Sequence, residues 1–411
     1  MLPLGPVTSQ STAALTSGAV YGTGFYGSNV YGLGGVSSGG TTYSAAQVQA
    51  LFFGPSLQID CYFDLLNADG HFKLDLTPLI DFTRPPTLDH DSSRAVKRQL
   101  ANLNMRSLSS VDVSRDLIRV RYQVLAPDGG WLQWPLGIFM FMPPVKSIAE
   151  GLTWWALNAP DLSQLLALAA LPTASASTAG TPYVQAVAQM LSVYGGPTRL
   201  TADLIDLGWT LPADLPWDGG ASYLTVINKL LEAAVYVPAA MRGTQLVSRP
   251  IPDYSQQPVV LMLDTVAGQG QVLGPFSETQ DRSNAYNQIG TTAGDPRLGE
   301  VTGYYENTRP ESPVSTVRSP PRFKLIQDSK LSTRAAAQAR AIAEIQAAAR
   351  IYSTLTVGLP PFPFFEDLDV VRLVYNSVDE GLVDERYLVN RWQCPLGMVP
   401  TVCDFQRVVA V

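Results

Sequence analysis

Alternation of apolar and polar residues predicts a run of short strands in the first third of the chain. In residues 117–125, an aliphatic or aromatic residue occupies every second position, which is the period of a half-buried strand. The same pattern, with turns such as Asp69-Gly70, predicts further strands over residues 57–66, 72–79, 131–141 and 151–157. Residues 93–103 fit either a strand or a short helix. Short strands joined by tight turns predict a small antiparallel barrel or sandwich over residues 49–158.

A helical period replaces this alternation from residue 159 onward. Apolar residues recur three and four positions apart, as in an amphipathic helix, over residues 160–171, 183–194 and 223–234. A short strand follows at residues 243–249. These elements predict a helical middle domain over residues 159–271.

The last part of the chain, residues 272–411, returns to strand-like alternation around one helix. Strands are predicted over residues 284–290, 353–357, 370–375, 385–393 and 402–409. An alanine-rich segment capped by Ser332 or Thr333 predicts the helix, with a narrow apolar stripe of Ile342, Ile345, Ala349 and Tyr352. The predicted fold class is α+β, with two small antiparallel β-barrel or sandwich domains separated by a helical domain.

Residues 1–48 follow neither period, and Gly, Ser, Thr and Tyr dominate them. A five-residue repeat places Tyr21, Tyr26 and Tyr31 in phase with glycines. So much glycine and so little aliphatic side chain predict a segment that is flexible when alone. Three rigid, amphipathic tyrosines can nevertheless dock on a partner chain or bind a sugar. This extended N-terminal arm is therefore a disordered leader, a partner-docking segment or a sugar-binding segment.

Composition bounds the size and the partners. The chain has 411 residues, 46% of them hydrophobic and only 15% charged. The length allows two to four domains, because a single core rarely grows beyond about 250–300 residues. So few charges predict a surface of uncharged polar residues or burial against other chains. The net charge of −7 gives no basic excess for gripping phosphates, so DNA is expected to pass without specific binding.

Cysteine spacing and hydropathy indicate the cellular compartment in which the protein assembles. Cys61, Cys394 and Cys403 have no Cys-x-x-Cys spacing, and an odd number argues against a disulfide framework. This fits assembly in a reducing cytoplasm. No apolar run approaches about 20 residues, and residues 1–30 lack a basic segment followed by an apolar core. Neither a membrane span nor a signal peptide is expected.

Patterns of catalytic or metal-binding residues are mostly absent from the sequence. His71 and His90 are predicted as surface turn residues, because a general base needs a paired partner group. No nucleophile elbow, zinc-ligand spacing or phosphate-binding glycine loop occurs. No catalytic residue, metal site or cofactor site is therefore predicted.

One acidic cluster has two interpretations. Glu366, Asp367 and Asp369 could supply a carboxylate pair for glycoside hydrolysis, which needs two acids about 5–9.5 Å apart. Because they follow three prolines and lead a strand, they are instead predicted to solvate a loop and stop strand extension.

Two further groups of residues also have a functional and a structural interpretation. Asp60, Asp64, Asp69 and Asp75 alternate around the first hairpin, but this spacing supplies too few oxygen ligands for Ca²⁺. Trp209 and Trp217 flank residues 212–216 and could form a platform for a glycan. Packing in a core or an interface is the favoured interpretation of both tryptophans.

The order of elements and several short motifs resemble the tail hub proteins of bacteriophages, which are minor tail or tail-tip proteins. An Asp-x-Ser-x-x-Leu helix start at residues 161–166 follows the first strands. The last domain has a Pro-x-Ser-Pro loop at residues 310–313, an alanine-rich helix, the segment Leu355 to Pro360, and an acid-led Asp-Val-Val-Arg-Leu strand at residues 369–373. The resemblance covers about residue 60 to the end of the chain.

This resemblance implies a structural virion protein with no enzymatic activity. In the tail hub family, two barrels in each of three chains give six similar units, so a homotrimeric ring can match a six-fold tail tube. The implied partners are tail tube and distal tail proteins, the tape measure protein and other tail-tip or baseplate proteins. The implied place is the virion tail tip, around the DNA exit path used in host cell entry. Two other classes stay open: a tail-borne glycan or peptidoglycan hydrolase, and a carbohydrate-binding adhesin.

Overall fold

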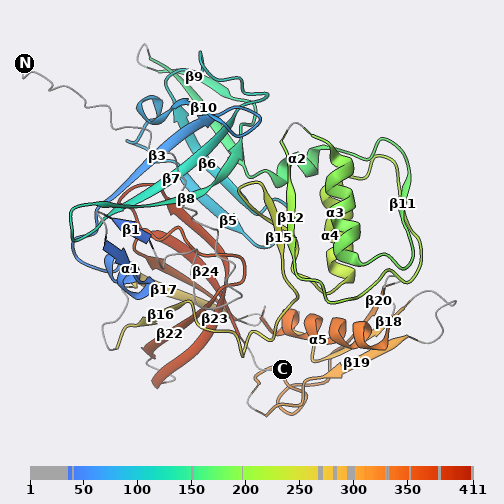
Figure 1. Ribbon diagram of the computed structural model, residues 1–411. Helices are drawn as coiled ribbons and strands as arrows, with labels where there is room; N and C mark the ends of the chain where they lie inside the picture. The colour runs from blue at the N-terminus through green and yellow to red at the C-terminus, as the bar shows by residue number, and fades with distance from the viewer. Residues whose placement is uncertain are drawn as a thin grey trace, which may run out of the picture.

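A computed structural model gives the structure of the protein (Figure 1). It describes residues 36–38, 41–149, 152–196, 198–266, 272–280, 285–293, 301–310, 312–328, 331, 333–350, 353–377 and 381–408. These residues contain five α-helices and mostly antiparallel sheets, which confirms the predicted α+β class. The division into two separate barrels and a helical domain stays a prediction.

A hairpin and a short helix open the described chain. Strands β1 (Val36–Ser38) and β2 (Thr41–Tyr43) pair antiparallel, and α1 (Ala45–Phe52) follows. Ser44 caps α1 through a reciprocal pair of hydrogen bonds with Gln47, which satisfies two backbone N–H groups at the helix start.

The first sheet contains four antiparallel strands in the order β4-β3-β7-β8. They are β3 (Ile59–Leu66), β4 (Phe72–Asp75), β7 (Leu117–Leu125) and β8 (Trp131–Met140). A single 3-10 turn (Thr77–Leu79) follows β4. The predicted strand at residues 117–125 coincides with β7, whose alternate residues are buried as the pattern requires.

The largest sheet joins strands from both ends of the chain. Among the described residues its main path is β17-β21-β24-β23-β5-β6-β10-β9, and β16 and β22 branch from β23. From the first part come β5 (Thr87–Asp91), β6 (Arg98–Met105), β9 (Val145–Ala149) and β10 (Leu152–Pro160). From the last part come β16 (Leu261–Asp264), β17 (Leu273–Gln280), β21 (Ser353–Leu359), β22 (Val370–Ser377), β23 (Gly381–Pro395) and β24 (Thr401–Arg407).

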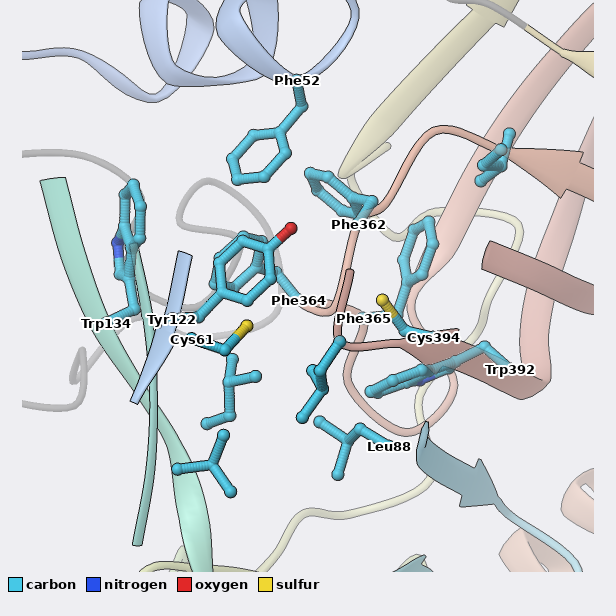
Figure 2. Close-up of a cluster of buried hydrophobic side chains, with 14 of the residues drawn as sticks. Phe52, Cys61, Leu88, Tyr122, Trp134, Phe362, Phe364, Phe365, Trp392 and Cys394 are labelled. Carbon is cyan, nitrogen blue, oxygen red and sulfur yellow. The ribbon is translucent and has the colours of Figure 1, made fainter. Parts of the chain in front are cut away.

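The two ends meet where β23 pairs with β5, with Trp392 opposite His90. One hydrophobic core contains residues from both ends of the chain. Figure 2 shows Tyr122 and Trp134 of the first sheet, and Phe52 of α1, around Phe362 and Phe364. The ring of Phe364 lies 5.2 Å from Phe52, 5.7 Å from Tyr122 and 5.2 Å from Trp134, between ring centroids. Both ends of the chain therefore share one aromatic core.

The helical part contains three helices around a second hydrophobic core. The helices are α2 (Ser163–Leu168), α3 (Tyr183–Tyr194) and α4 (Tyr223–Ala233). Two short sheets complete this part, with strands β11 (Ser175–Ser177), β12 (Thr201–Leu204), β13 (Leu215–Trp217), β14 (Ala240–Arg242) and β15 (Gln245–Ser248). The predicted helices at 183–194 and 223–234 are confirmed.

A 40-residue repeat organises the helical part. A short strand, a glycine turn and a tyrosine-led helix occur in residues 171–194 and again in 211–234. The two copies pair across an approximate two-fold axis, because Leu171 bonds through its N–H and C=O to Ala221 and Gly220, as Leu211 does to Thr181 and Gly180. Each copy thus satisfies the backbone of the other.

The predicted helix over residues 160–171 is wrong at both ends. Pro160 closes strand β10, and α2 ends at Leu168. Ala169 and Leu171 instead bond to Tyr223 and Ala221 of the second repeat copy. Long-range pairing therefore overrides the local helical pattern. Residues 98–103 of the undecided segment lie in strand β6, which extends to Met105.

A small sheet and α5 form the last unit. Strands β18 (Gln288–Thr292), β19 (Thr302–Glu306) and β20 (Phe323–Gln327) are ordered β19-β18-β20, and α5 (Arg334–Arg350) covers one face (Figure 1). Thr333 caps α5, because its hydroxyl accepts the Ala336 N–H at 3.1 Å. Gly303 allows the close approach: a Cβ there would lie 2.4 Å from the Ala337 carbonyl carbon.

The buried stripe of α5 differs from the predicted one. Ile345 and Ala349 are fully buried as predicted, but Ala341 takes the place expected for Ile342, which is only half-buried. Tyr352 lies outside the described residues. The other side of α5 is tied to α4, since Arg340 donates to the Glu232 carboxylate at 2.6 Å. One side of α5 therefore packs on the small sheet and another contacts α4. The weak apolar period of this alanine-rich segment does not predict which residues make these contacts.

Candidate functional site

The acids at residues 366–369 lie in a buried ionic junction where three parts of the chain meet. We use this name for the set His90, Lys97, Arg98, Asp161, Arg242, Glu366, Asp367 and Asp369. Asp369 is 9% exposed, and the side chain of Asp367 is 11% exposed. The prediction that these acids solvate a loop is wrong, because buried Phe362, Phe364 and Phe365 draw the preceding segment into the core.

Lys97 is the centre of this junction. Its ammonium donates to the Pro238 carbonyl oxygen at 2.7 Å and to a carboxylate oxygen of Asp367. The other carboxylate oxygen of Asp367 lies 3.5 Å from Nε2 of His90. One cation of the first strand-rich part therefore holds both the helical part and the last part.

The charges of this cluster decide the ionisation of Asp367. Burial alone would raise the pKa of Asp367, but Lys97 and His90 hold that pKa well below its usual range. Asp367 is therefore a buried carboxylate, stabilised by a cation that is itself only 1% exposed at its side chain.

Arg98 adds a second link between the same parts. Its Nη2 donates to the Phe365 carbonyl oxygen at 3.1 Å, and its backbone N–H donates to Asp161 Oδ2 at 3.2 Å. The guanidinium also lies 5.9 Å from the centroid of the Trp392 ring. Burial raises the pKa of Asp161, and hydrogen bonds from Ser163 oppose that rise.

Arg242 of β14 completes the junction from the helical part by pairing with Glu366. The Glu366 N–H donates to Asp369 Oδ2 at 2.8 Å. Burial, and then repulsion from Glu366, raise the pKa of Asp369 to about 7. The three acids are thus engaged with cations or backbone between packed elements, an arrangement that fastens the helical part to the strands.

Replacing Asp369 with Asn tests this junction through pH. In the folded protein Asp369 keeps its proton up to about pH 7, whereas the unfolded chain releases it near pH 4, so unfolding becomes more favourable as pH rises through this window. Asn accepts the same N–H and cannot ionise. We expect wild-type stability to fall relative to D369N between pH 5 and pH 8, by a few kcal/mol at most. Urea unfolding at both pH values measures the difference, and equal pH dependence of the two proteins would contradict it.

The two histidines differ in environment. His71 is exposed, as predicted for a turn residue. His90 is 1% exposed in strand β5, and its ring stacks on Trp392 with centroids 5.7 Å apart. The prediction of a surface turn is wrong for His90, because the pairing of β5 with β23 buries it.

The remaining sequence candidates have structural contacts. Asp64 is fully buried and pairs with Arg119 at 2.7 Å and Arg121 at 2.8 Å, on strands β3 and β7. The three cysteines are buried and free. Trp217 is 6% exposed and donates from Nε1 to Ser177 Oγ at 2.9 Å, which confirms packing in the core; Trp209 packs partly against the same core.

Sequence reasoning missed the basic half of the ionic junction. Lys97 and Arg98 are an adjacent pair at the start of β6, Arg242 ends β14, and no motif or spacing connects them. A detectable signal existed for the 40-residue repeat, since Leu171, Gly180 and Tyr183 recur as Leu211, Gly220 and Tyr223.

Other surface features include an exposed apolar pair on β9 and a groove. On edge strand β9, Val145 is 67% and Ile148 70% exposed. A groove of about 710 Å³ beside β16, β22 and β23 is lined in part by Arg372, Asp384 and Glu385. Among the described residues, no set of three or more His, Cys, Asp or Glu side chains could hold a metal ion. None of the described helices combines the length and the hydrophobicity needed to cross a bilayer.

The structure of this chain resembles several solved structures, although sequence comparisons find no relative. No protein-family model and no curated protein matches the chain. The tail protein from Neisseria meningitidis MC58 matches with a TM-score of 0.58 and 13% identity, over 84% of this chain and 96% of that one. The prophage MuSo2 43 kDa tail protein from Shewanella oneidensis matches with a TM-score of 0.54 and 10% identity, over 85% and 98%.

A third match is the prophage tail protein gp18 from Listeria monocytogenes EGD-e, with a TM-score of 0.55 and 14% identity, over 84% of this chain and 94% of that one. These matches include strand-rich and helical parts alike, since each spans more than four fifths of both chains. Over most of its length, this chain has the fold of phage and prophage tail proteins.

Proposed function

We propose that this chain is a structural subunit of a phage tail tip, a hub that assembles as a trimeric ring between the six-fold tail tube and the tip or baseplate proteins. The fold likeness to three tail proteins over at least 84% of the chain carries this proposal. Each of those matches includes nearly the whole of the related chain. A tail role for the whole chain is therefore favoured over a role for one module.

Two features support the ring. Strand-rich parts at residues 49–158 and 272–411 would give three chains six units, as a six-fold tube requires. Within the described part of the chain, the main path of the large sheet also ends in two different edges, β9 and β17. Unlike edges suit head-to-tail contacts, which close into a ring when the rotation per subunit is one third of a turn. The exposed Val145 and Ile148 supply apolar surface at the β9 edge.

The role is mechanical. The hub would contact tail tube and distal tail proteins, the tape measure protein and other tip proteins through interfaces of more than about 2,000 Å². It would assemble in the host cytoplasm and surround the DNA exit path, where a wall without basic excess avoids trapping DNA. The ionic junction and the shared aromatic core would keep the three parts of each subunit rigid while load passes through the ring.

The two alternatives depend on different residues. A hydrolase using Glu366, Asp367 and Asp369 gains no support from their geometry, because Lys97 and Arg242 engage two of these acids in a buried site. Loss of a measurable lytic activity in alanine variants of all three acids would favour it. An adhesin depends on Tyr21, Tyr26 and Tyr31, outside the described residues, and saturable glycan binding that is lost with them would favour it.

The mass of the purified chain tests the ring. We expect native mass spectrometry to give three times the chain mass of 44.4 kDa. The interfaces should hold at micromolar protein concentration, because obligate interfaces of this size are stable. A particle of 44.4 kDa at that concentration would contradict a trimeric hub.

A further inference from the structure

The small sheet β19-β18-β20 has one covered and one open face. Its covered face packs on α5 through Ile289, Gly303 and Ile326. By strand alternation the opposite face carries Tyr304, Phe323 and Leu325, which are 50%, 54% and 54% exposed. Large apolar side chains on an open sheet face indicate an interaction site.

Gly290 makes this face continuous. It is the residue of the central strand opposite both Tyr304 and Leu325. A Cβ at Gly290 would lie 2.9 Å from Cζ of Phe323 and 3.3 Å from Cδ1 of Leu325. The two side chains therefore lie across the glycine and bury it. The result is a continuous apolar surface on the open face beside strand β20.

Strand β20 also has an unpaired edge. It pairs with β18 on one side, and among the described residues no strand pairs with its other side. Residues 323–327 contain no proline. The one charged residue, Lys324, reaches Glu344 of α5 at 3.4 Å on the covered side. Prolines and outward-pointing charges on an edge strand block the addition of another strand. The edge of β20 has neither, so it is suited to accept an added strand.

The charges near the open face indicate which kind of segment can bind there. Among the described strand residues of the open face, Glu306 is the one carboxylate and there is no Lys, Arg or His; hydrogen bonds from Thr316 and Tyr304 keep the pKa of Glu306 low. Two other places described above are close to charges: Lys146 lies within β9, and Arg372 and Asp384 line the groove. The face beside β20 therefore fits an extended apolar segment with no charged side chain.

The N-terminal arm has this chemistry. Residues 1–35 lie outside the described residues and contain no Asp, Glu, Lys, Arg or His. An extended segment of 35 residues can span at most about 115–125 Å. The arm joins the described chain at Val36 of β1, on the left of Figure 1, whereas β20 lies on the right. The tyrosine repeat begins only 16 residues before Val36, a reach of at most about 53–58 Å. We therefore take a neighbouring copy as the occupant, and the test below distinguishes it from the same copy.

We infer that a segment within residues 20–34 of one copy adds a strand to the free edge of β20 in a neighbouring copy, with tyrosines packing on the faces of the extended sheet. Because the repeat is five residues long, consecutive tyrosines alternate between the two faces of a strand. Tyr21 and Tyr31 then share one face and Tyr26 takes the other. Because ten residues of strand span about 33 Å and β20 has only five residues, one of these tyrosines at a time lies beside Phe323 and Leu325. The inference goes beyond the proposed function, because any assembly of two or more copies supplies the two surfaces.

Engineered cysteine pairs in the full chain test the contact. Leu325→Cys is combined in turn with Tyr21→Cys, Tyr26→Cys and Tyr31→Cys, and each protein is oxidised; the native cysteines are buried. We expect covalent multimers on a non-reducing gel with at least one pair. The matched control joins the same arm cysteines to Ile148→Cys, which is 70% exposed on β9. Equal multimers from both positions, or none with Leu325→Cys, would overturn the inference, and links confined to one chain would overturn the neighbouring copy.

Hydrogen exchange gives a second readout without new cysteines. We expect the amides of residues 323–327 to exchange at least about tenfold more slowly in the full chain than in the variant with Tyr21, Tyr26 and Tyr31 replaced by Ser. Amides of residues 145–149 serve as the control and should not change. If the purified protein exchanges residues 323–327 equally fast with and without the tyrosines, the arm does not cover this edge, and a helix or strand of another protein becomes the candidate.

Discussion

Replacement of Lys97 with Met is expected to lower the free energy of unfolding by about 3–5 kcal/mol, the cost of leaving a buried carboxylate without its partner. Met preserves most of the side-chain length. It removes the ammonium that bonds to Asp367 and to the Pro238 carbonyl oxygen. Asp367 would then be left in a buried site, with the His90 ring as a remaining side-chain neighbour.

Urea unfolding at neutral pH measures this effect. Arg94→Met in the same loop is the matched control, because Arg94 is 51% exposed in its pair with Asp91, and surface pairs contribute about 0–1 kcal/mol. The double variant Lys97→Met with Asp367→Asn should recover part of the loss, since it removes the buried charge. A loss for Lys97→Met no larger than that for Arg94→Met would show that the ionic junction does not hold the three parts together.

Replacement of Phe364 with Ala is expected to cost about 3–5 kcal/mol, the range for removal of a buried aromatic ring. Phe364 is 1% exposed, and its ring contacts Phe52, Tyr122 and Trp134. Its loss would leave a cavity at the junction of α1, the first sheet and the last part of the chain (Figure 2). The expected effect is therefore on the whole fold and not on one end of it.

Thermal or urea unfolding measures this prediction with Phe72→Ala as the control. Phe72 is 57% exposed, so its replacement should change stability by less than about 1 kcal/mol. A single unfolding transition, shifted as a whole in Phe364→Ala, is expected from a shared core. Two transitions, with one unshifted, would mean that the two ends unfold separately.

The sequence predicts elements best where one face is buried by near neighbours. Strand β7 and helices α3 and α4 follow their apolar periods closely. Helix α2 does not, because residues 169–171 pair with a segment 50 residues away. In α5 the alanines leave the period weak, so contacts with Gly303 and Glu232 decide which residues are buried.

The ionic junction shows why site chemistry was harder to predict than fold. The acids at residues 366–369 could be identified as a cluster, but their environment depends on strand β5 and on Lys97, about 270 residues earlier. Their burial follows from the pairing of β23 with β5, which no local pattern encodes. The same pairing explains why His90 is buried beside Trp392.

The central claim is that this chain is a subunit of a phage tail tip. Electron microscopy of purified particles, labelled with gold-conjugated antibody raised against this chain, tests it most directly. The account predicts label at the end of the tail distant from the head. Label on the head or along the whole tail would contradict the account. Phage particles produced by the host that encodes this chain, but lacking the chain, would also contradict it.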